Sequence, residues 1–217
     1  GSFILPLFLT DINRVMHNQQ PLTDSDAWTL YPDHHHWFNK LWLSEKLGYV
    51  CGPADAPVPY SSKYIVRPVI NLLGMGVGAS IQHLKSGPAR IPAGYFWCEL
   101  FSGPHYTADY TRTDTGWQQT RLMQGFRNSD SLTEFSKWVK VYDKQLDLPE
   151  IFQELHGVPH INVEFVGSHV IELHLRPNPD PDCSELIPVW QSNPVSSPSD
   201  RHYWISAPDD AGGQISN

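Results

Sequence analysis

The alternating stretch from residue 161 to 179 limits the fold more than any other part of the chain. On both sides of Gly167-Ser168, apolar residues alternate with polar ones. This period of two predicts two half-buried β-strands joined as a hairpin. Each strand then has an apolar face that a second layer must cover. The chain is therefore expected to contain an antiparallel sheet with one buried side.

The register of this hairpin decides which polar side chains are neighbours. A two-residue turn at Gly167-Ser168 would set apolar Val163 against Glu172 and mix the two faces. A three-residue loop, Gly167 to His169, keeps apolar residues opposite one another and is the predicted connection. It pairs Phe165 with Ile171, Val163 with Leu173, Glu164 with Glu172, and Asn162 with His174.

Glu164 and Glu172 are thus predicted to lie side by side on the polar face. Two carboxylates directly across a ladder repel each other, at a cost of roughly a few tenths to one kcal/mol. A divalent cation or a cationic side chain removes that cost. The hairpin alone leaves two interpretations open: a metal site, or a solvated face on which Arg176 or lysines neutralise the glutamates.

Length and composition favour one sizeable domain or two small lobes. The chain has 217 residues, of which 40% are hydrophobic, enough to bury a core. Its 15 Lys and Arg against 23 Asp and Glu give a formal charge of -8, so nucleic acid is not an expected partner. The three cysteines are odd in number and widely spaced, which argues against a disulfide framework or structural zinc and fits a reducing cytoplasm.

Elsewhere the patterns are less regular. The apolar run at residues 1–9 is too short to span a bilayer, so no membrane association is expected, and it is predicted to be a buried first strand. One helix is predicted from Asp33, as its cap, to Gly48. Further helices are predicted at 131–141 and 148–156, and strands at 81–86, 95–99 and 105–111. Residues 23–33, 112–127 and the chain beyond 185 show no clear periodicity.

Two short motifs remain ambiguous by themselves. Gly74, Gly76 and Gly78 follow an apolar strand, where backbone N–H groups can approach phosphate closely, but a turn in a bent sheet has the same signature. The run His34 to His36 is expected on a helix surface, with a metal-dependent hydrolase built from it and the two glutamates as the less favoured alternative.

The order of these parts resembles the ATP-grasp superfamily of carboxylate–amine ligases. In that family a strand ending in Lys-Pro precedes a glycine-rich loop, and YIVRPVINLLGMGVGA is similar, with Arg67 in place of the lysine. The family hinge is an apolar strand, a glutamate, two apolar residues and Gly-x-Glu. FWCELFSGPH is similar: Glu99 matches the first acid and His105 replaces the second.

The family's magnesium ligands lie on a late hairpin, as an acid on one strand and Glu-x-Asn on the next. The segments VEF and IELHLRPNP resemble this arrangement, with Glu164 and Glu172 as metal carboxylates and His174 where the family has asparagine. FNKLWLSEKLGYVCGPADAPVP resembles the family's lysine-bearing helix and Gly-x-Pro loop. The resemblance covers residues 39–179, and the chain also resembles uncharacterised phage-encoded proteins of this kind.

The resemblance implies an α+β, two-lobed ATP-grasp-like fold with antiparallel sheets and a nucleotide cleft between the lobes. It divides the chain into an N-terminal remnant of a substrate domain (1–32), an N-lobe (33–102) and a C-lobe with the metal hairpin and an irregular tail (103–217). The implied activity is an ATP- and Mg²⁺- or Mn²⁺-dependent ligase that activates a carboxylate as an acyl phosphate for attack by an amine or thiol. Its substrates would be small-molecule or peptide carboxylates and amines.

The resemblance also assigns roles to residues. Arg67 and the backbone of residues 74–78 would hold phosphates, and Glu99 with His105 would lie near adenine and ribose. Glu164, Glu172 and His174 would bind the metal. Arg176 would be catalytic, stabilising phosphoryl oxygens.

Three substitutions and a short N-terminus distinguish this chain from the family pattern. A guanidinium is not equivalent to an ammonium, His105 cannot accept two ribose hydrogen bonds, and the His174 nitrogen suits Mn²⁺ better than Mg²⁺. With only about thirty residues before Asp33, the acceptor site is expected to be either truncated or supplied by a homo-oligomer or a partner chain. The alternative function is therefore a catalytically degenerate, ATP-grasp-like nucleotide-binding or assembly protein.

Overall fold

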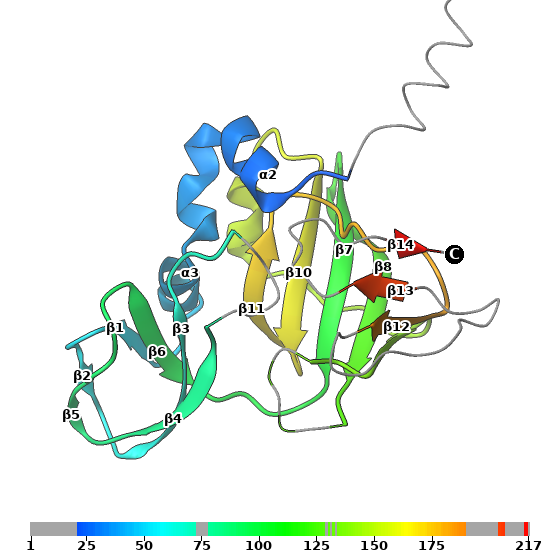
Figure 1. Ribbon diagram of the computed structural model, residues 1–217. Coiled ribbons are helices and arrows are strands. Elements are labelled where there is room, and N and C mark those ends of the chain that lie inside the picture. The colour runs from blue at the N-terminus through cyan, green and yellow to red at the C-terminus, as the bar shows by residue number, and fades with distance from the viewer. Residues whose placement is uncertain are drawn as a thin grey trace, which may run out of the picture.

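Antiparallel sheets dominate the structure and helical segments are few, so the predicted α+β class is confirmed. The computed structural model describes residues 21–72, 78–128, 130, 132, 134–189, 204–206 and 215–216. A four-stranded sheet has the order β1-β6-β3-β4, an eight-stranded sheet the order β11-β10-β7-β8-β9-β12-β13-β14, and β2 pairs with β5. All pairings are antiparallel except that of β12 with β13. The two larger sheets lie apart and are joined by one crossing from β6 to β7 (Figure 1).

The strands fall into two groups along the chain. The first group, before the crossing, comprises β1 (Cys51–Pro53), β2 (Pro57–Val58), β3 (Ser62–Pro68), β4 (Ser80–Leu84), β5 (Gly87–Pro88) and β6 (Tyr95–Glu99). The second comprises β7 (His105–Thr113), β8 (Gly116–Phe126), β9 (Lys137–Lys140), β10 (His160–Val166), β11 (His169–His174), β12 (Glu185–Val189), β13 (Trp204–Ser206) and β14 (Ile215–Ser216).

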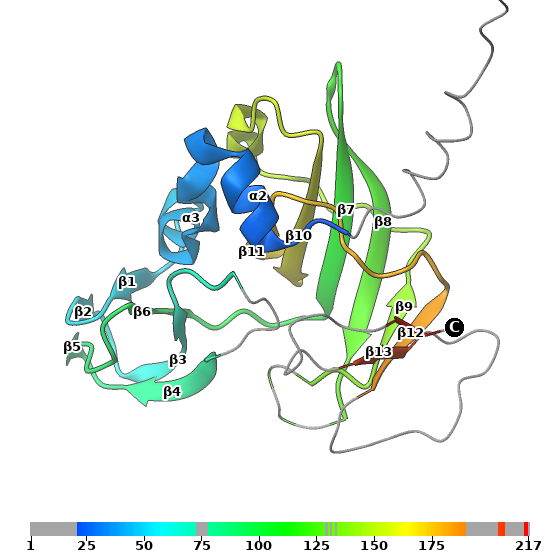
Figure 2. The ribbon, with the colours of Figure 1, turned by 45° about the horizontal axis from the view of Figure 1, so that its top comes forward.

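The helical segments are short. They are α2 (Asp24–Leu30), the 3-10 helix η1 (Pro32–Phe38), α3 (Lys40–Lys46) and the 3-10 helix η2 (Glu150–Glu154). In two views 45° apart, α2 and α3 lie beside β11, the edge strand of the larger sheet (Figures 1 and 2). They therefore bring side chains from before the crossing to the polar hairpin.

In the β10–β11 hairpin, the predicted pairing of the polar residues is confirmed and the predicted turn is wrong. Glu164 faces Glu172, and Asn162 faces His174, as predicted. Phe165, however, faces Val170, so the loop is the two-residue turn Gly167-Ser168. A β-bulge between Glu164 and Phe165 shifts the register. One extra residue lets a tight turn and an unmixed apolar face coexist.

The helix predicted from Asp33 to Gly48 is instead two helical segments. The chain breaks at Asn39, whose side chain accepts a hydrogen bond from the Trp42 N–H at 2.9 Å and so caps α3. Asp33 lies in the first turn of η1 and makes no cap bond. Gly48 does provide the predicted left-handed residue after the helix, with φ +74°.

Four other predictions of secondary structure are wrong or incomplete. Residues 23–33 are not irregular: they hold α2, started by a capping box between Thr23 and Asp26. The helix predicted at 131–141 contains strand β9, because pairing with β8 favours the β-branched and aromatic residues there over their helical spacing. Residues 116–126 and 185–189, left unassigned or taken as loop, are strands β8 and β12. In 148–156, only the 3-10 turn η2 forms.

Each large sheet has its own apolar cluster. The larger sheet packs its apolar face against the helical segments, with Trp37, Phe152 and Val163 among the buried members. The smaller sheet buries Tyr64, Val66 and Trp97. The opposite face of β10 and β11 carries the polar residues, so hydrophobic burial fixes the position of the predicted site.

Some predictions lie outside the described residues, namely the first strand at 1–9 and the glycines at 74 and 76. Within the described part of the chain, no helix is both long and apolar enough to cross a bilayer.

Candidate functional site

Glu164, Glu172 and His174 come together on the polar face of the hairpin. One possible ligand atom of each lies within 4.8 Å of those of the other two. Glu164 and Glu172 face each other across the ladder, and His174 follows two residues later on the same face. The sequence-predicted set of metal-binding side chains is therefore brought together.

Lys40 at the start of α3 holds one of these carboxylates. Its Nζ lies 2.8 Å from Oε1 of Glu172, and the side chains of Lys40 and Glu172 are 6% and 9% exposed. The backbone N–H of Lys40 donates to Val69 O at the end of β3. Lys40 was not predicted as a site residue, although it lies in the lysine-bearing segment that resembles the family's lead-in.

Asp24 on α2 holds the other end of the cluster. His174 Nδ1 lies 3.0 and 3.1 Å from the two carboxylate oxygens of Asp24, across 150 residues of sequence. Burial opposes a charge on the imidazole, but the charge and hydrogen bond of Asp24 outweigh it and raise the pKa of His174 to about 9. Burial likewise opposes the Asp24 anion, but His174 and Arg176 lower the pKa of Asp24 to about 2.

Arg176 is occupied by the same carboxylate. Its Nη2 donates to Asp24 Oδ2 at 3.0 Å, and its Nε lies 2.9 Å from Oδ1. Its Nη1 donates to the carbonyl of Pro177 at 3.2 Å. The predicted catalytic arginine therefore lies next to the cluster, but it is paired with Asp24 through one hydrogen bond and one charge contact.

His105, at the start of β7, contacts the cluster. Its Nε2 lies 3.0 Å from Glu164 Oε2, and Arg127 Nη2 donates to its Nδ1 at 3.3 Å. Because an arginine can only donate, Nδ1 accepts and the proton of the neutral ring is on Nε2. Burial favours the neutral acid, but His105 and His174 hold the pKa of Glu164 well below its usual range.

Arg67 reaches from the smaller sheet to the hairpin. Its Nη2 donates to the carbonyl of Ile171 on β11 at 2.8 Å, and its guanidinium lies 5.2 Å from the centroid of Phe96. The side chain is buried, yet Nε has no hydrogen-bond partner among the described residues. A buried arginine with an unused donor at this place fits an anion between the two sheets.

The hinge-like segment joins the two large sheets and is pinned to the hairpin turn. Gly167 N–H donates to Pro104 O at 2.8 Å. A Cβ on Gly103 would lie 2.9 Å from Gly167 Cα. The Phe101 and His169 rings stack with centroids 4.2 Å apart. Contacts through this turn therefore fix the linker where it enters β7.

Glu99 and Gly78 take structural roles in the described part of the chain. Glu99 Oε1 accepts from Val50 N–H at 2.8 Å, which ties β6 to the residue before β1. Gly78 has φ +81°, and a Cβ there would lie 2.8 Å from the Tyr95 hydroxyl. Neither residue contacts the hairpin cluster through a hydrogen bond or ion pair given by the structure.

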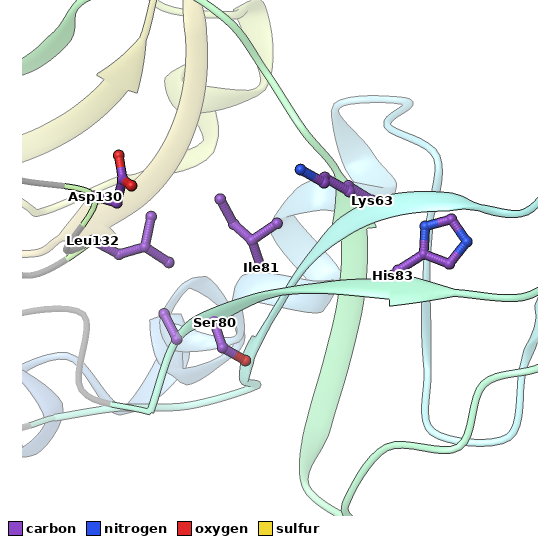
Figure 3. Close-up of a pocket in the computed structure, with 7 residues that line it drawn as sticks. Lys63, Ser80, Ile81, His83, Asp130 and Leu132 are labelled. Carbon is purple, nitrogen blue, oxygen red and sulfur yellow. The ribbon is translucent and has the colours of Figure 1, made fainter.

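A hollow of about 730 Å³ lies between the smaller sheet and the segment around residue 130. Figure 3 shows Ile81 and His83 on β4 and Lys63 on the neighbouring β3, with Asp130 and Leu132 on the other side of the hollow. The carbonyl of Leu132 accepts from Arg127 at 3.0 Å. Arg127 therefore lies between this segment and His105. Among the described residues, no predicted site residue lines the hollow.

The His34 to His36 run is not part of the cluster. His34 Nε2 lies 2.8 Å from the carbonyl of His156, and His35 stacks on Trp28 with centroids 3.7 Å apart. Among the described residues, the group that could hold a metal is Glu164, Glu172 and His174. The alternative of a hydrolase built on this run gains no support.

Solved structures resemble the chain, although no protein-family model and no curated protein matches it. An ATP-grasp superfamily protein from Archaeoglobus fulgidus matches at 16% identity and TM-score 0.41, over 66% of this chain and 46% of that one. An L-amino acid ligase from Bacillus licheniformis matches at 11% identity and TM-score 0.41, over 65% of this chain and 41% of its own.

The likeness is partial. N5-carboxyaminoimidazole ribonucleotide synthetase from Thermus thermophilus matches at 12% identity and TM-score 0.42, over 79% of this chain and 59% of that one. The chain thus spans less than two thirds of each of these proteins. At such scores the likeness concerns the fold and assigns no activity.

Proposed function

We propose that the chain binds ATP with a divalent cation between its two large sheets, as an ATP-dependent ligase that activates a carboxylate as an acyl phosphate for attack by an amine or thiol. One observation carries the proposal: Lys40 and Arg67, from before the crossing, both reach the hairpin strand that bears Glu172. Cations facing a pair of carboxylates form the charge pattern that a metal–triphosphate complex requires.

Arg67 and Lys40 are the proposed phosphate contacts. The unused Nε of Arg67 can donate to a phosphoryl oxygen while Nη2 keeps its bond to Ile171. Lys40 is paired with Glu172, the residue that follows Ile171 on β11. The glycine segment 74–78 and Glu99 remain proposed contacts for the phosphates and the nucleoside. We place the boundary between the lobes at 102/103, inside the linker from β6 to β7.

The donor set of the hairpin fits a divalent cation. Glu164 and Glu172 offer carboxylate oxygens and His174 offers a ring nitrogen, all within reach of one ion after a small contraction. A bound ion would neutralise phosphoryl charge as it develops. His105 takes one oxygen of Glu164 and leaves the other facing His174.

The remaining side chains orient the reacting groups. Lys40 and Arg67 would withdraw charge from the phosphoryl group, which passes through a transition state with charge spread over its oxygens. Arg176 would contribute through Nη1, which donates to the Pro177 carbonyl and not to Asp24. The buried position of Lys40 excludes water and strengthens its interaction with an anion.

Calorimetry with ATP and Mn²⁺ or Mg²⁺, followed by an ADP-release assay over a panel of amino acids and thiols, tests the proposal. We expect metal-dependent ATP binding that Glu172→Gln abolishes and Asp55→Asn leaves unchanged, since Asp55 is paired with Arg90 on the surface. Absence of ATP binding by the wild-type chain with either ion would overturn the proposal.

The second candidate function is a catalytically silent nucleotide-binding or assembly protein. It is favoured because the charged side chains of the cluster already have ion-pair partners within the chain. Glu172 pairs with Lys40, Glu164 with His105, and Asp24 with both His174 and Arg176. The cluster is therefore compensated without an added ion. Metal-dependent ATP binding without ADP release across the whole substrate panel would favour this function.

A further inference from the structure

We propose that Asp24 and His174 form a carboxylate–histidine pair that gives the cation site a nitrogen ligand, so that the site selects Co²⁺ or Zn²⁺, and to a lesser degree Mn²⁺, over Mg²⁺. The inference rests on the proposed function only in that a divalent cation binds at the hairpin. It adds the class of ion and a positioning residue, Asp24.

The imidazole of His174 has one nitrogen engaged and one directed at the two glutamates. Nδ1 is bonded to Asp24 at 3.0 and 3.1 Å. Nε2 lies 3.8 Å from Glu164 Oε1 and 3.9 Å from Glu172 Oε1, distances longer than a hydrogen bond. Nε2 is therefore the nitrogen that an ion between the glutamates would meet.

Asp24 is held as rigidly as a positioning group requires. Arg176 contacts both of its oxygens, and its side chain is 4% exposed. The capping box of Thr23 and Asp26 fixes the first turn of α2, and Ala27 anchors that helix in the larger apolar core. A carboxylate held in this way fixes the tautomer and orientation of a histidine ligand and raises its basicity.

The resulting donor set is one nitrogen and two carboxylates. Mg²⁺ demands near-octahedral oxygen coordination at about 2.0–2.1 Å. Imidazole nitrogen suits borderline transition-metal ions better, and affinity for them rises from Mn²⁺ to Co²⁺. Ligands to one ion at that radius lie about 3 to 4 Å apart, so the observed spread of 4.8 Å closes with shifts on the order of 1 Å.

The ion-pair partners of the two glutamates, His105 and Lys40, leave carboxylate oxygens that an ion can reach. His105 occupies Oε2 of Glu164, so Oε1, the atom nearer His174, remains for an ion. Lys40 contacts Oε1 of Glu172, the oxygen that lies 3.9 Å from His174 Nε2. An ion would therefore share Oε1 with Lys40 or bind Oε2 of Glu172. An ion would take the place of the proton that Nε2 carries when the ring is charged, and that proton leaves to solvent.

The test measures binding of Mg²⁺, Mn²⁺ and Co²⁺ to the full chain without nucleotide, by calorimetry. We expect Co²⁺ to bind at least about tenfold more tightly than Mg²⁺, with Mn²⁺ between them. Pulsed electron paramagnetic resonance of bound Mn²⁺ is expected to show coupling to a nitrogen nucleus. Wild-type protein suffices for both measurements, so neither depends on the folding of a variant.

Two variants separate the roles of the pair. His174→Asn offers an oxygen in place of the nitrogen and is expected to lower the Co²⁺-to-Mg²⁺ affinity ratio about tenfold or more and to remove the nitrogen coupling. Asp24→Asn leaves the ligands in place and is expected to weaken Co²⁺ binding about 10- to 100-fold. Asp55→Asn, on the surface, is the control and should bind all three ions as the wild type does.

The outcomes distinguish this inference from the proposed function. Equal affinity for Mg²⁺ and Co²⁺, or bound Mn²⁺ without nitrogen coupling, would overturn the inference while a cation-dependent ligase survives. Failure of all three ions to bind, with or without ATP, would overturn both.

Discussion

Lys40 Nζ lies 2.8 Å from Glu172 Oε1, and this ion pair between α3 and β11 is almost completely buried. Removing one partner of a buried pair leaves an uncompensated charge and costs about 3–5 kcal/mol. We therefore expect Lys40→Met to lower the free energy of unfolding by that amount, measured by urea denaturation.

Two controls make this prediction specific. Lys40→Met combined with Glu172→Leu removes both charges and should recover most of the loss, because apolar replacement of a whole buried pair is often neutral. Arg90→Met breaks an ion pair whose side chains are 83% and 74% exposed and should cost less than about 1 kcal/mol. A loss for Lys40→Met no larger than that of Arg90→Met would contradict the prediction.

The hairpin could be predicted because its pattern is local. A period of two, together with the need to keep apolar residues on one face, was enough to pair Glu164 with Glu172. The two-residue turn was missed because a β-bulge compensates for it, and no residue type near Ile171 signals a bulge. Periodicity therefore gave the faces correctly where turn chemistry alone did not.

Asp24 and Lys40 show what local patterns do not contain. Asp24 meets His174 across 150 residues, and Lys40 meets Glu172 only because α3 packs beside β11. Residues 137–140 form a strand because β8 offers a pairing edge, although their own spacing suits a helix. In each case a distant segment decides the outcome, and a single sequence carries no signal for that contact.

The Asp24–His174 pair predicts a loss of stability in alkaline solution. The pKa of His174 is raised from its usual 6.5 to about 9 in the folded chain, so the protonated ring favours folding. This contribution is fully present below pH 6.5 and is lost as the pH rises through 9. We expect the free energy of unfolding to fall between these values, by on the order of 3 kcal/mol from this group.

Asp24 gives the free energy of unfolding a pH dependence of the opposite sign, in acid solution. The pKa of Asp24 is lowered from 3.8 to about 2, so its contribution is present above pH 3.8 and is lost as the pH falls through 2. Denaturation of wild type and Asp24→Asn from about pH 2 to about pH 10 checks both pH dependences. The variant should be less stable near pH 5 and should show a shallower decline above pH 6.5. Parallel curves for the two proteins would contradict the prediction.

Gly103 is predicted to be required for the contact between the linker and the hairpin turn. Its φ is +125°, and a Cβ would lie 2.9 Å from Gly167 Cα and 3.1 Å from Gly167 N. Backbone strain of about 1–3 kcal/mol and overpacking of about 1–3 kcal/mol together should make Gly103→Ala lose about 2–6 kcal/mol of stability in chemical denaturation.

Gly48→Ala is the matched control for Gly103→Ala. Gly48 also has a positive φ, +74°, but no atom lies within 4 Å of a Cβ built there. It carries the backbone strain without the clash, so its cost should be about 1 kcal/mol. Equal losses for the two variants would show that the contact with the hairpin turn contributes nothing.

Arg67→Lys tests whether the guanidinium bridges the two sheets and an anion at once. Arg67 Nη2 is committed to the Ile171 carbonyl while Nε has no partner. An ammonium keeps the charge but lacks the planar fork that contacts two groups in fixed geometry. The variant can therefore satisfy Ile171 or a phosphate, and we expect its Kd for ATP with Mn²⁺ to rise about tenfold, or ~1.4 kcal/mol.

Arg90→Lys on the surface should bind ATP as the wild type does. Calorimetry provides the affinities and thermal unfolding reports whether the fold is retained. Wild-type affinity in a folded Arg67→Lys protein would mean that Arg67 holds the hairpin edge alone and that the phosphates bind elsewhere.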